Sequence, residues 1–223
     1  MIRAVDRSVG RVMQALRDEG LDSNTIVIFT SDNGAPGYIG LPEVNRPYRG
    51  WKLTLFEGGI RVPFVAQWPG RLPPGLRYGA PVSNIDLLPT LAAAAGVRLP
   101  TDRHIDGVNL LPHLGQGGPV QPARPLFWRD GPYRAVQDQG WKLITAQRPR
   151  KDWLFHLATD PTEKHNLADT QPQKLAQLQA LLTAHHAGLP PALWPSFIEM
   201  PILIDKTLDQ KEQPGDEYAY WYN

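Results

Sequence analysis

Two short segments of the sequence contain side chains whose types and spacing could do chemistry. In the first, Asp32 and Asn33 directly follow a run of β-branched and apolar residues at 25–30. Carboxylate and amide oxygens are donors that suit Ca²⁺ or Mg²⁺, and ligand sites in open α/β sheets lie just beyond the carboxyl ends of strands. These two side chains fill at most about three of the roughly 6–8 oxygen positions of calcium. The alternative is an ordinary strand-ending turn, since Asp, Asn and Gly favour turns.

The second segment is a basic stretch around Lys52. Between residues 46 and 77 the sequence has six basic residues and one acidic residue. A loop lysine is a compact charge with three donors, which suits an oxygen of a sulfate or phosphate group. We expect Glu57 and Arg61 to hold the geometry of the loop around Lys52. The alternative is that Lys52 is merely solvated, and that Glu57 and the two glycines after it form a backbone turn that needs positive φ angles.

The elements that must position these residues alternate between helix and strand in the first part of the chain. Apolar residues recur at helical spacing over residues 2–19 and Gly20 follows, which predicts an amphipathic helix. The continuous run at 25–30 is typical of a strand covered on both faces in a parallel sheet. A second strand is predicted at 62–68 and a second helix at 85–95. The pattern predicts an α/β fold.

The character of the sequence changes near residue 119. Short aromatic and aliphatic runs predict a small antiparallel meander, with strands at 133–138, 141–146 and 153–157. Leucines at helical spacing, with Pro172 in the first turn and Gly188 after the end, predict a helix. From residue 190 onward the chain is rich in proline and aromatic residues, and we expect an irregular tail. The sequence therefore predicts two domains, residues 1–118 and residues 119–223.

The composition excludes several classes of protein. The 223 residues carry a formal net charge of +1, which gives no global field for a polyanion, so we expect no nucleic acid partner. Residues 1–150 hold 18 basic and 12 acidic side chains, so an anionic ligand is expected in this part. The absence of cysteine excludes disulfides, cysteine zinc sites and a thiol nucleophile. The sequence shows neither a membrane-spanning stretch nor a signal-peptide core, and it leaves the compartment undecided.

Taken together, the two segments closely resemble the formylglycine-dependent sulfatase family, which has an alkaline-phosphatase-like fold. The resemblance reaches to about residue 187, and the residues that carry it are 25–34, Lys52, 56–63, 85–91, Asp106-Gly107, Trp141-Lys142-Leu143 and 160–167. It implies that Asp32 and Asn33 are two ligands of an active-site calcium, and that Lys52 contacts the sulfate ester and its bridging oxygen. The implied fold is part of a doubly wound sheet domain, followed by a small subdomain with an antiparallel sheet and a helix.

The sequence departs from the family at the nucleophile. Sulfatases carry in their N-terminal half a pair of metal-binding aspartates and a Cys or Ser, within a short motif, that is oxidised to formylglycine. This chain has no cysteine, and no serine is followed two residues later by proline, the serines being Ser8, Ser23, Ser31, Ser83 and Ser196. The chain therefore resembles the second half of a sulfatase. We expect no nucleophile in it, no activity from it alone, and the missing N-terminal half as a candidate partner.

The resemblance implies hydrolysis of a sulfate ester, with an aryl or carbohydrate sulfate as the substrate. A related metal-dependent phosphatase or phosphodiesterase of the same superfold is one alternative, which the Glu-Gly-Gly sequence after Lys52 argues against. A non-catalytic remnant or an interaction subunit is the other alternative, and the missing nucleophile favours it.

Overall fold

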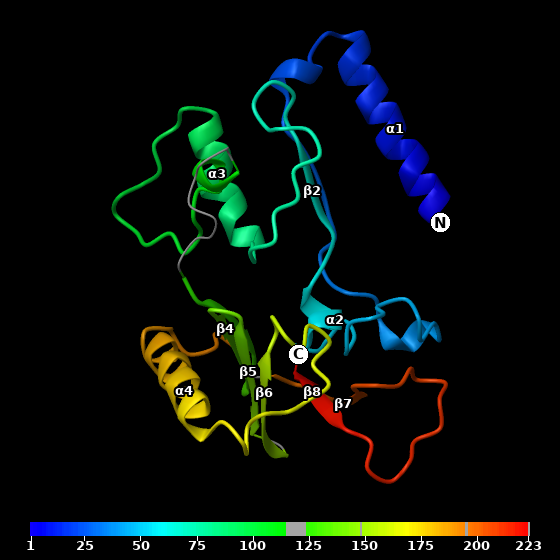
Figure 1. Ribbon diagram of the computed structural model, residues 1–223, viewed down its shortest axis with the longest axis vertical. Coiled ribbons are helices and arrows are strands. Elements are labelled where there is room, and N and C mark those ends of the chain that lie inside the picture. The colour runs from blue at the N-terminus through cyan, green and yellow to red at the C-terminus, as the bar shows by residue number, and fades with distance from the viewer. Residues whose placement is uncertain (115–123, 148, 195, 223) are drawn as a thin grey trace. The chain divides into compact units, whose positions relative to one another are not determined.

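The computed structural model describes residues 1–114, 124–147, 149–194 and 196–222 (Figure 1). These residues form two compact units. The first unit comprises residues 1–30 and 64–123, and the second comprises residues 31–63 and 124–223. The expected domain boundary at 118/119 lies outside the described residues. Both segments with candidate site residues, 31–34 and 49–61, belong to the second unit.

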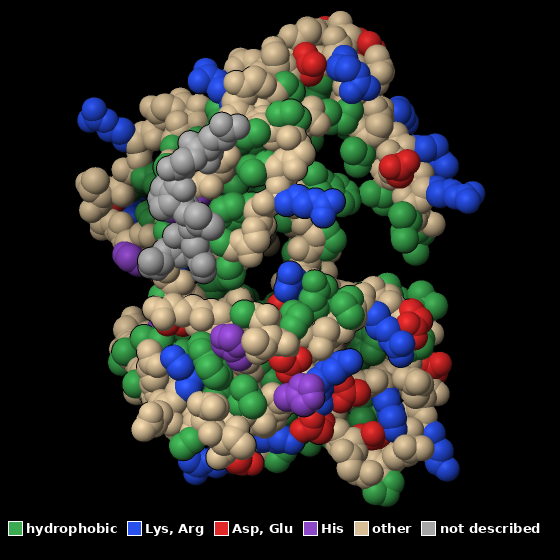
Figure 2. All heavy atoms as spheres, in the orientation of Figure 1, with side chains coloured by type: hydrophobic (Ala, Val, Ile, Leu, Met, Phe, Trp, Pro, Cys, Tyr) green, Lys and Arg blue, Asp and Glu red, His purple; other side chains and the backbone are tan. Residues whose placement is uncertain are grey.

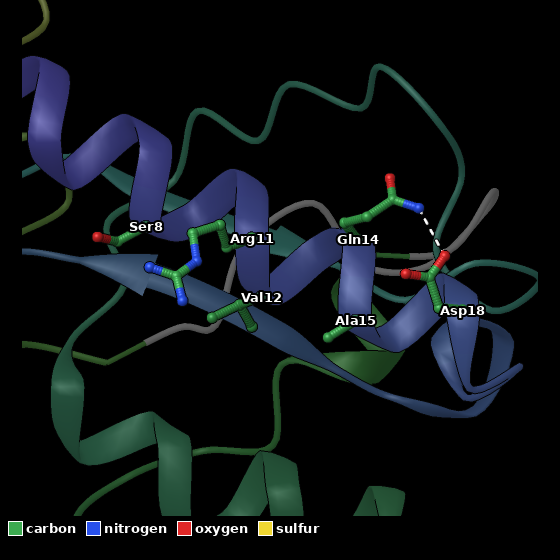
Figure 3. A pocket seen from close by; sticks show the side chains of 6 residues that line it. All are labelled: Ser8, Arg11, Val12, Gln14, Ala15 and Asp18. Carbon is green, nitrogen blue, oxygen red and sulfur yellow. Dashed lines mark hydrogen bonds between the residues drawn. The ribbon is translucent and has the colours of Figure 1, made fainter.

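The first unit begins with the amphipathic helix that the sequence predicts. Helix α1 spans Ile2–Asp18, and Gly20 follows with a φ of 66°. Although its apolar stripe is regular, α1 buries none of its residues. Figure 2 shows hydrophobic and basic side chains side by side on the surface of this helix. The hollow drawn in Figure 3 is lined by α1 side chains alone, so it is an open helix face, across which Gln14 donates a 2.7 Å hydrogen bond to Asp18.

The expectation of a parallel strand covered on both faces is wrong for the described residues. Strand β1 (Val27–Thr30) pairs antiparallel with β2 (Phe64–Gln67), in a sheet of these two strands. Phe29 is 44% exposed and Val65 is 60% exposed. An apolar run shows that a strand prefers apolar neighbours on both faces, but it does not specify which strand pairs with it or in which direction. No doubly wound sheet is formed by the part of the chain that the structure describes.

A second helix in the first unit confirms the prediction at 85–95. A short 3₁₀ turn at Asn84–Asp86 leads into α3 (Leu87–Ala94). The buried carboxylate of Asp86 accepts hydrogen bonds from the backbone amides of Ser83 and Val108, at 2.8 and 2.9 Å. Asp86 therefore has a structural role: it caps the turn and ties it to the segment that follows α3.

The second unit contains the predicted meander with one strand more than expected. Its strands are paired in the order β3-β4-β5-β6, all antiparallel, and they span Leu126–Asp130, Tyr133–Asp138, Trp141–Gln147 and Arg150–His156. Strand β3 was not predicted. Helix α4 (Pro172–Ala187) has the predicted bounds and lies along this sheet in Figure 1.

The two faces of the meander bury different partners, as the alternation of a strand requires. On one face, Leu143 packs with Leu178 and Leu182 of α4. On the other face, Ile144 belongs to a cluster that includes Phe56 of the loop after Lys52. This second face therefore supports the loop that carries the candidate site.

The expectation of an irregular tail after residue 190 is wrong in part. Strands β7 (Glu199–Leu203) and β8 (Tyr218–Tyr222) form an antiparallel pair with Leu203 opposite Tyr218. The two strands are separated by a loop of polar residues, so the sequence offers no short turn that would signal a hairpin. Two short helical elements complete the second unit, a 3₁₀ turn at Gly37–Ile39 and α2 (Glu57–Ile60). Among the described residues, no helix has both the length and the apolarity that crossing a membrane requires.

Candidate functional site

The candidate metal ligands lie in the turn that follows β1, which we call the Asp32 turn (residues 31–34). The side chain of Asp32 is exposed and that of Asn33 is half-buried. The hydroxyl of Ser31 donates a 2.9 Å hydrogen bond to the carbonyl of Asn33, which closes the turn. These residues therefore form a strand-ending turn, and the turn exposes the carboxylate of Asp32 at the surface.

Backbone hydrogen bonds join the Asp32 turn to the segment that carries Lys52, which we call the Lys52 loop (residues 49–56). The amide of Gly34 donates to the carbonyl of Gly59 at 2.9 Å, and the amide of Lys52 donates to the carbonyl of Ala35 at 3.1 Å. A Cβ at position 34 would lie 1.7 Å from the carbonyl oxygen of Gly58, so only glycine permits this close approach. The structure thus brings Asp32, Asn33 and Lys52 into one cluster of loops.

The side chain of Asn45 adds a second connection between these segments. Its carbonyl oxygen accepts a hydrogen bond from the amide of Ala35, and its amide nitrogen donates to the carbonyls of Ala35 and Gly50, all at 2.9 to 3.0 Å. The sequence around Asn45 carries no local signal of this role. A side chain that binds three backbone groups from two segments fixes their spacing without regular secondary structure.

Lys52 differs from its basic neighbours in having no charged partner. Arg46 pairs with Glu43, Arg49 with Asp205, and Arg61 with Glu57 at 3.4 Å. Within the described residues, the half-buried Lys52 side chain has no hydrogen bond or ion pair. The next residue, Leu53, has a φ of 79°, a conformation that non-glycine residues rarely adopt. Among the described residues, Lys52 is therefore the basic side chain of residues 46–61 without an ion pair.

The Asp32 turn fits a metal ion in the kind of its donors and falls short in their number. Asp32 and Asn33 offer a carboxylate and an amide oxygen, which are the donors that Ca²⁺ and Mg²⁺ prefer. Among the residues that the structure describes, no group of three or more His, Cys, Asp or Glu side chains could hold a metal ion. The turn can therefore contribute part of a calcium site and needs further oxygen ligands from other residues.

Glu57 is part of a buried ion cluster that sequence analysis only half anticipated. The Nζ atom of Lys142 lies 2.8 Å from a carboxylate oxygen of Glu57 and 2.8 Å from one of Glu163. Arg61 reaches the other oxygen of Glu57 at 3.4 Å, a pairing that the sequence did not predict. Lys142 and Glu163 were missed as charged partners, although both lie in segments that carry the family resemblance. The signal was a lysine between the apolar residues of a predicted strand.

The electrostatics of this cluster follow from burial and pairing. Burial opposes the charged form of Glu57, but the charges and hydrogen bonds of Lys142 and Arg61 together outweigh it and hold the pKa of Glu57 below its ordinary value. Burial likewise opposes the charge of Lys142, yet the two carboxylates raise the pKa of this lysine. Burial raises the pKa of Glu163, the charge of Lys142 lowers it in part, and the neighbouring carboxylate of Glu57 raises it further.

Arg49 anchors the start of the Lys52 loop to the C-terminal strands. Its guanidinium donates to both carboxylate oxygens of Asp205, at 2.7 and 2.6 Å, and it also pairs with Glu217. Asp205 and Glu217 belong to the segment between β7 and β8. Burial opposes the charged form of Glu217, but hydrogen bonds from Lys151 and Arg49 lower the pKa of Glu217 to about 2. The C-terminal strands therefore hold the loop in place.

Comparison with known proteins gives the family to which this chain belongs. A family model described as Sulfatase matches residues 1–97, which include the Asp32 turn and the Lys52 loop. The chain belongs to the sulfatase family. It is 44% identical over 133 residues to the N-acetylgalactosamine-6-sulfatase of Homo sapiens, a match that covers 58% of this chain and 25% of that protein. It is 44% identical over 238 residues to the steryl-sulfatase of Rattus norvegicus, covering 84% of this chain and 40% of that protein.

A solved structure shows the same partial match. The crystal structure of Ps i-CgsB in complex with k-i-k-neocarrahexaose superposes with a TM-score of 0.75 at 31% identity, covering 83% of this chain and 41% of that chain. The chain thus spans between a quarter and about two fifths of the length of these proteins. The matched portion is C-terminal in the sulfatases, in agreement with the resemblance seen in the sequence.

Proposed function

We propose that this chain supplies part of the active site of a sulfuric ester hydrolase that acts on carbohydrate sulfates. One observation carries the proposal: backbone hydrogen bonds hold the Asp32 turn against the Lys52 loop, and Lys52 is the cation of residues 46–61 that has no internal partner. The names of the similar proteins support a sulfate ester as the substrate, and one solved relative was crystallised in complex with k-i-k-neocarrahexaose. An aryl sulfate remains the alternative substrate class.

Lys52 would act on the charge of the sulfate ester. Its ammonium group is a point charge with three donors, so it can neutralise a sulfuryl oxygen and the bridging oxygen on which negative charge develops as the ester bond breaks. Asp32 and Asn33 would hold a Ca²⁺ or Mg²⁺ ion together with ligands from other residues. When bound, that ion would polarise a sulfuryl oxygen.

We expect the nucleophile to come from residues outside this chain. Members of the family use formylglycine, and this sequence holds neither a cysteine nor the serine motif from which it is made. The family assignment therefore agrees with two possible roles for this chain. Either it completes an active site with the nucleophile-bearing part of a sulfatase, or it is a non-catalytic remnant or interaction subunit.

Anion binding by the chain itself tests the proposal. Inorganic sulfate is titrated into the chain in the presence of Ca²⁺, and backbone amide shifts are followed by NMR. We expect weak, saturable shifts at Gly34 and Lys52, lost in Lys52→Ala and retained in the control Lys164→Met, an exposed lysine of the same unit. Sulfate binding that survives Lys52→Ala would overturn the assignment. Preferential binding of inorganic phosphate at the same residues would favour the phosphatase alternative.

Calcium is tested in the same experiment with the anion left out. One carboxylate and one amide supply about three of roughly 6–8 oxygens, so we expect calorimetry to detect no calcium site tighter than about millimolar. Binding in the micromolar range that is lost in Asp32→Ala would show that the described residues complete the site without further ligands.

A further inference from the structure

The buried ion cluster of the second unit connects the meander to the candidate site. Lys142 lies on β5 and is fully buried, Glu163 lies in the turn region after β6 and is fully buried, and Glu57 is the first residue of α2. Glu57 and Lys142 are 85 residues apart in the sequence. With Arg61 at 3.4 Å from Glu57, the cluster has two positive and two negative side chains, so its charges balance without an external ligand.

Glu163 binds the backbone of α2 as well as the lysine. Its second carboxylate oxygen accepts a 2.6 Å hydrogen bond from the amide of Glu57. The N-cap residue of α2, Phe56, makes no side-chain capping hydrogen bond. Glu163 itself has a φ of 56°, a costly conformation for a residue other than glycine. The hydrogen bond from the Glu57 amide and the ion pair with Lys142 stabilise this conformation of Glu163, and they fix the position of Glu57 at the start of α2.

The backbone of α2 packs closely against the Lys52 loop and the Asp32 turn, so the position of α2 determines theirs. Gly58 donates a 2.6 Å hydrogen bond to the carbonyl of Arg49, and Gly59 accepts the bond from Gly34. A Cβ on Gly58 would lie 2.2 Å from the carbonyl of Gly50, and one on Gly59 would lie 2.4 Å from that of Trp51. Because these contacts leave no space, α2 cannot shift without moving the Lys52 loop and the Asp32 turn.

We propose that Lys142 and Glu163 are positioning residues: the ion pairs of Lys142 with Glu163 and Glu57, and the hydrogen bond from the Glu57 amide to Glu163, set the spacing between the Asp32 turn and Lys52. The proposal rests on the role proposed above for Lys52. Neither residue would contact the substrate, since both are fully buried and internally paired. They would act indirectly: they fix the position of α2, and Gly58 and Gly59 of α2 contact the Lys52 loop and the Asp32 turn.

Local amide exchange in the full chain tests this proposal without depending on sulfate binding. Glu163→Gln keeps an oxygen for the amide of Glu57 but removes the charge that holds Lys142. We expect the amides of Gly34 and Lys52 to exchange about tenfold faster in this variant, while those of Val136 and Leu143 in the meander change by less than about threefold. Lys164→Met, which removes an exposed lysine next to Glu163, serves as the control and leaves both sets unchanged.

A double variant separates positioning from the cost of an unpaired buried charge. Lys142→Met alone leaves two buried carboxylates together, and it is expected to destabilise the whole second unit. Lys142→Met/Glu163→Gln removes one charge of each sign, so we expect it to recover the melting temperature but to keep the fast exchange at Gly34 and Lys52. Recovery of both properties, or equal acceleration in the meander and at the site, would overturn the proposal.

Sulfate affinity gives the readout that a purely structural role would not change. We expect inorganic sulfate to bind at least about fivefold more weakly to Glu163→Gln than to the unaltered chain at a temperature where both are folded, and equally well to Lys164→Met. If sulfate fails to bind the unaltered chain, the proposed function fails while the exchange comparison still decides the positioning role. Unchanged affinity in Glu163→Gln, with sulfate bound at Lys52, would contradict that role.

Discussion

At the scale of residues, charge pairing distinguishes the candidate functional lysine from the other basic side chains. The sequence shows a run of basic residues that suits an anion, but Arg49 and Arg61 use their charges within the molecule. Lys142 does the same with two carboxylates. Lys52 has no such pair in the part of the chain that the structure describes. The unpaired positive charge of residues 46–61 is therefore smaller than the sequence count, and Lys52 carries it among the described ion pairs.

We predict that Lys52→Ala lowers kcat about 10²- to 10³-fold in an active sulfatase that contains these residues. Losing a positioned donor where charge develops costs about 2.7–4 kcal/mol of transition-state stabilisation. The half-buried Lys52 side chain forms no ion pair with any residue that the structure describes, so its removal should change the free energy of unfolding by less than about 1 kcal/mol. Steady-state kinetics with an aryl sulfate and thermal melting check this, with Lys164→Met as the control. An unchanged kcat with a large fall in melting temperature would give Lys52 a structural role.

Local signals single out Asp32, Asn33 and Lys52 as candidates, whereas the partners of the charged residues could not be predicted. A carboxylate after an apolar run and a lysine before a glycine pair are visible within a few positions. The bond from Glu57 to Glu163 joins residues 106 positions apart, and a lone lysine in a strand pattern does not specify its partner. That the Asp32 turn lies against the Lys52 loop also depends on Gly34 and Asn45, whose contacts are set by the folded chain.

At the scale of elements, the contact between the Asp32 turn and α2 depends on Gly34. We predict that Gly34→Ala separates the turn from α2, because the added Cβ would lie 1.7 Å from the carbonyl of Gly58. Overpacking of this kind costs roughly 1–3 kcal/mol of folding free energy. The matched control is Gly79→Ala, where a Cβ meets nothing within 4 Å. Denaturant unfolding and the amide exchange of Gly59 measure the difference, and equal behaviour of the two variants would contradict the close approach.

The attachment of the C-terminal strands to the Lys52 loop is expected to weaken in acid. The pKa of Glu217 is about 2 in the folded chain, against an ordinary value of 4.5, so its stabilising contribution is complete above about pH 4.5 and is lost as the pH falls toward 2. We predict that Glu217→Gln lowers the melting temperature near neutral pH, and that the difference from the unaltered chain disappears near pH 2. Asp169→Asn, an exposed carboxylate in the same unit, controls for general charge effects. A difference that is independent of pH would contradict this ionic link.

Elements with a local sequence period were predicted well, and those defined by pairing were not. The bounds of α1, α3 and α4 agree with the helical spacing of their apolar residues to within two residues. The predicted parallel pairing of β1 was wrong, because its antiparallel pairing with β2 involves residues more than thirty positions away. Strands β7 and β8 were missed for the same reason, since a long polar loop separates them.

At the scale of the whole chain, the two units differ in how fully they bury their apolar residues. The second unit has apolar clusters on both faces of its meander, and these include Phe56, Trp153, Leu143 and Leu178. The helix and strands of the first unit leave large apolar side chains exposed, including Val12, Phe29, Val65 and Leu88. The chain also spans only a part of the length of its relatives, which have additional sequence.

We predict that the isolated 223-residue chain associates with itself through the first unit. Exposed apolar side chains of α1, β1 and β2 favour contact with any apolar surface, and folded domains are stable by only about 5–15 kcal/mol, so uncovered elements also open readily. Size-exclusion chromatography over a range of concentrations should show elution that shifts toward larger species. Replacing Val5 and Val12 by serine should reduce this shift, whereas replacing Arg3 and Arg11 on the same helix by serine should not. A concentration-independent monomer with one cooperative melting transition would contradict the prediction, and it would favour the non-catalytic alternative in which these residues are complete as they stand.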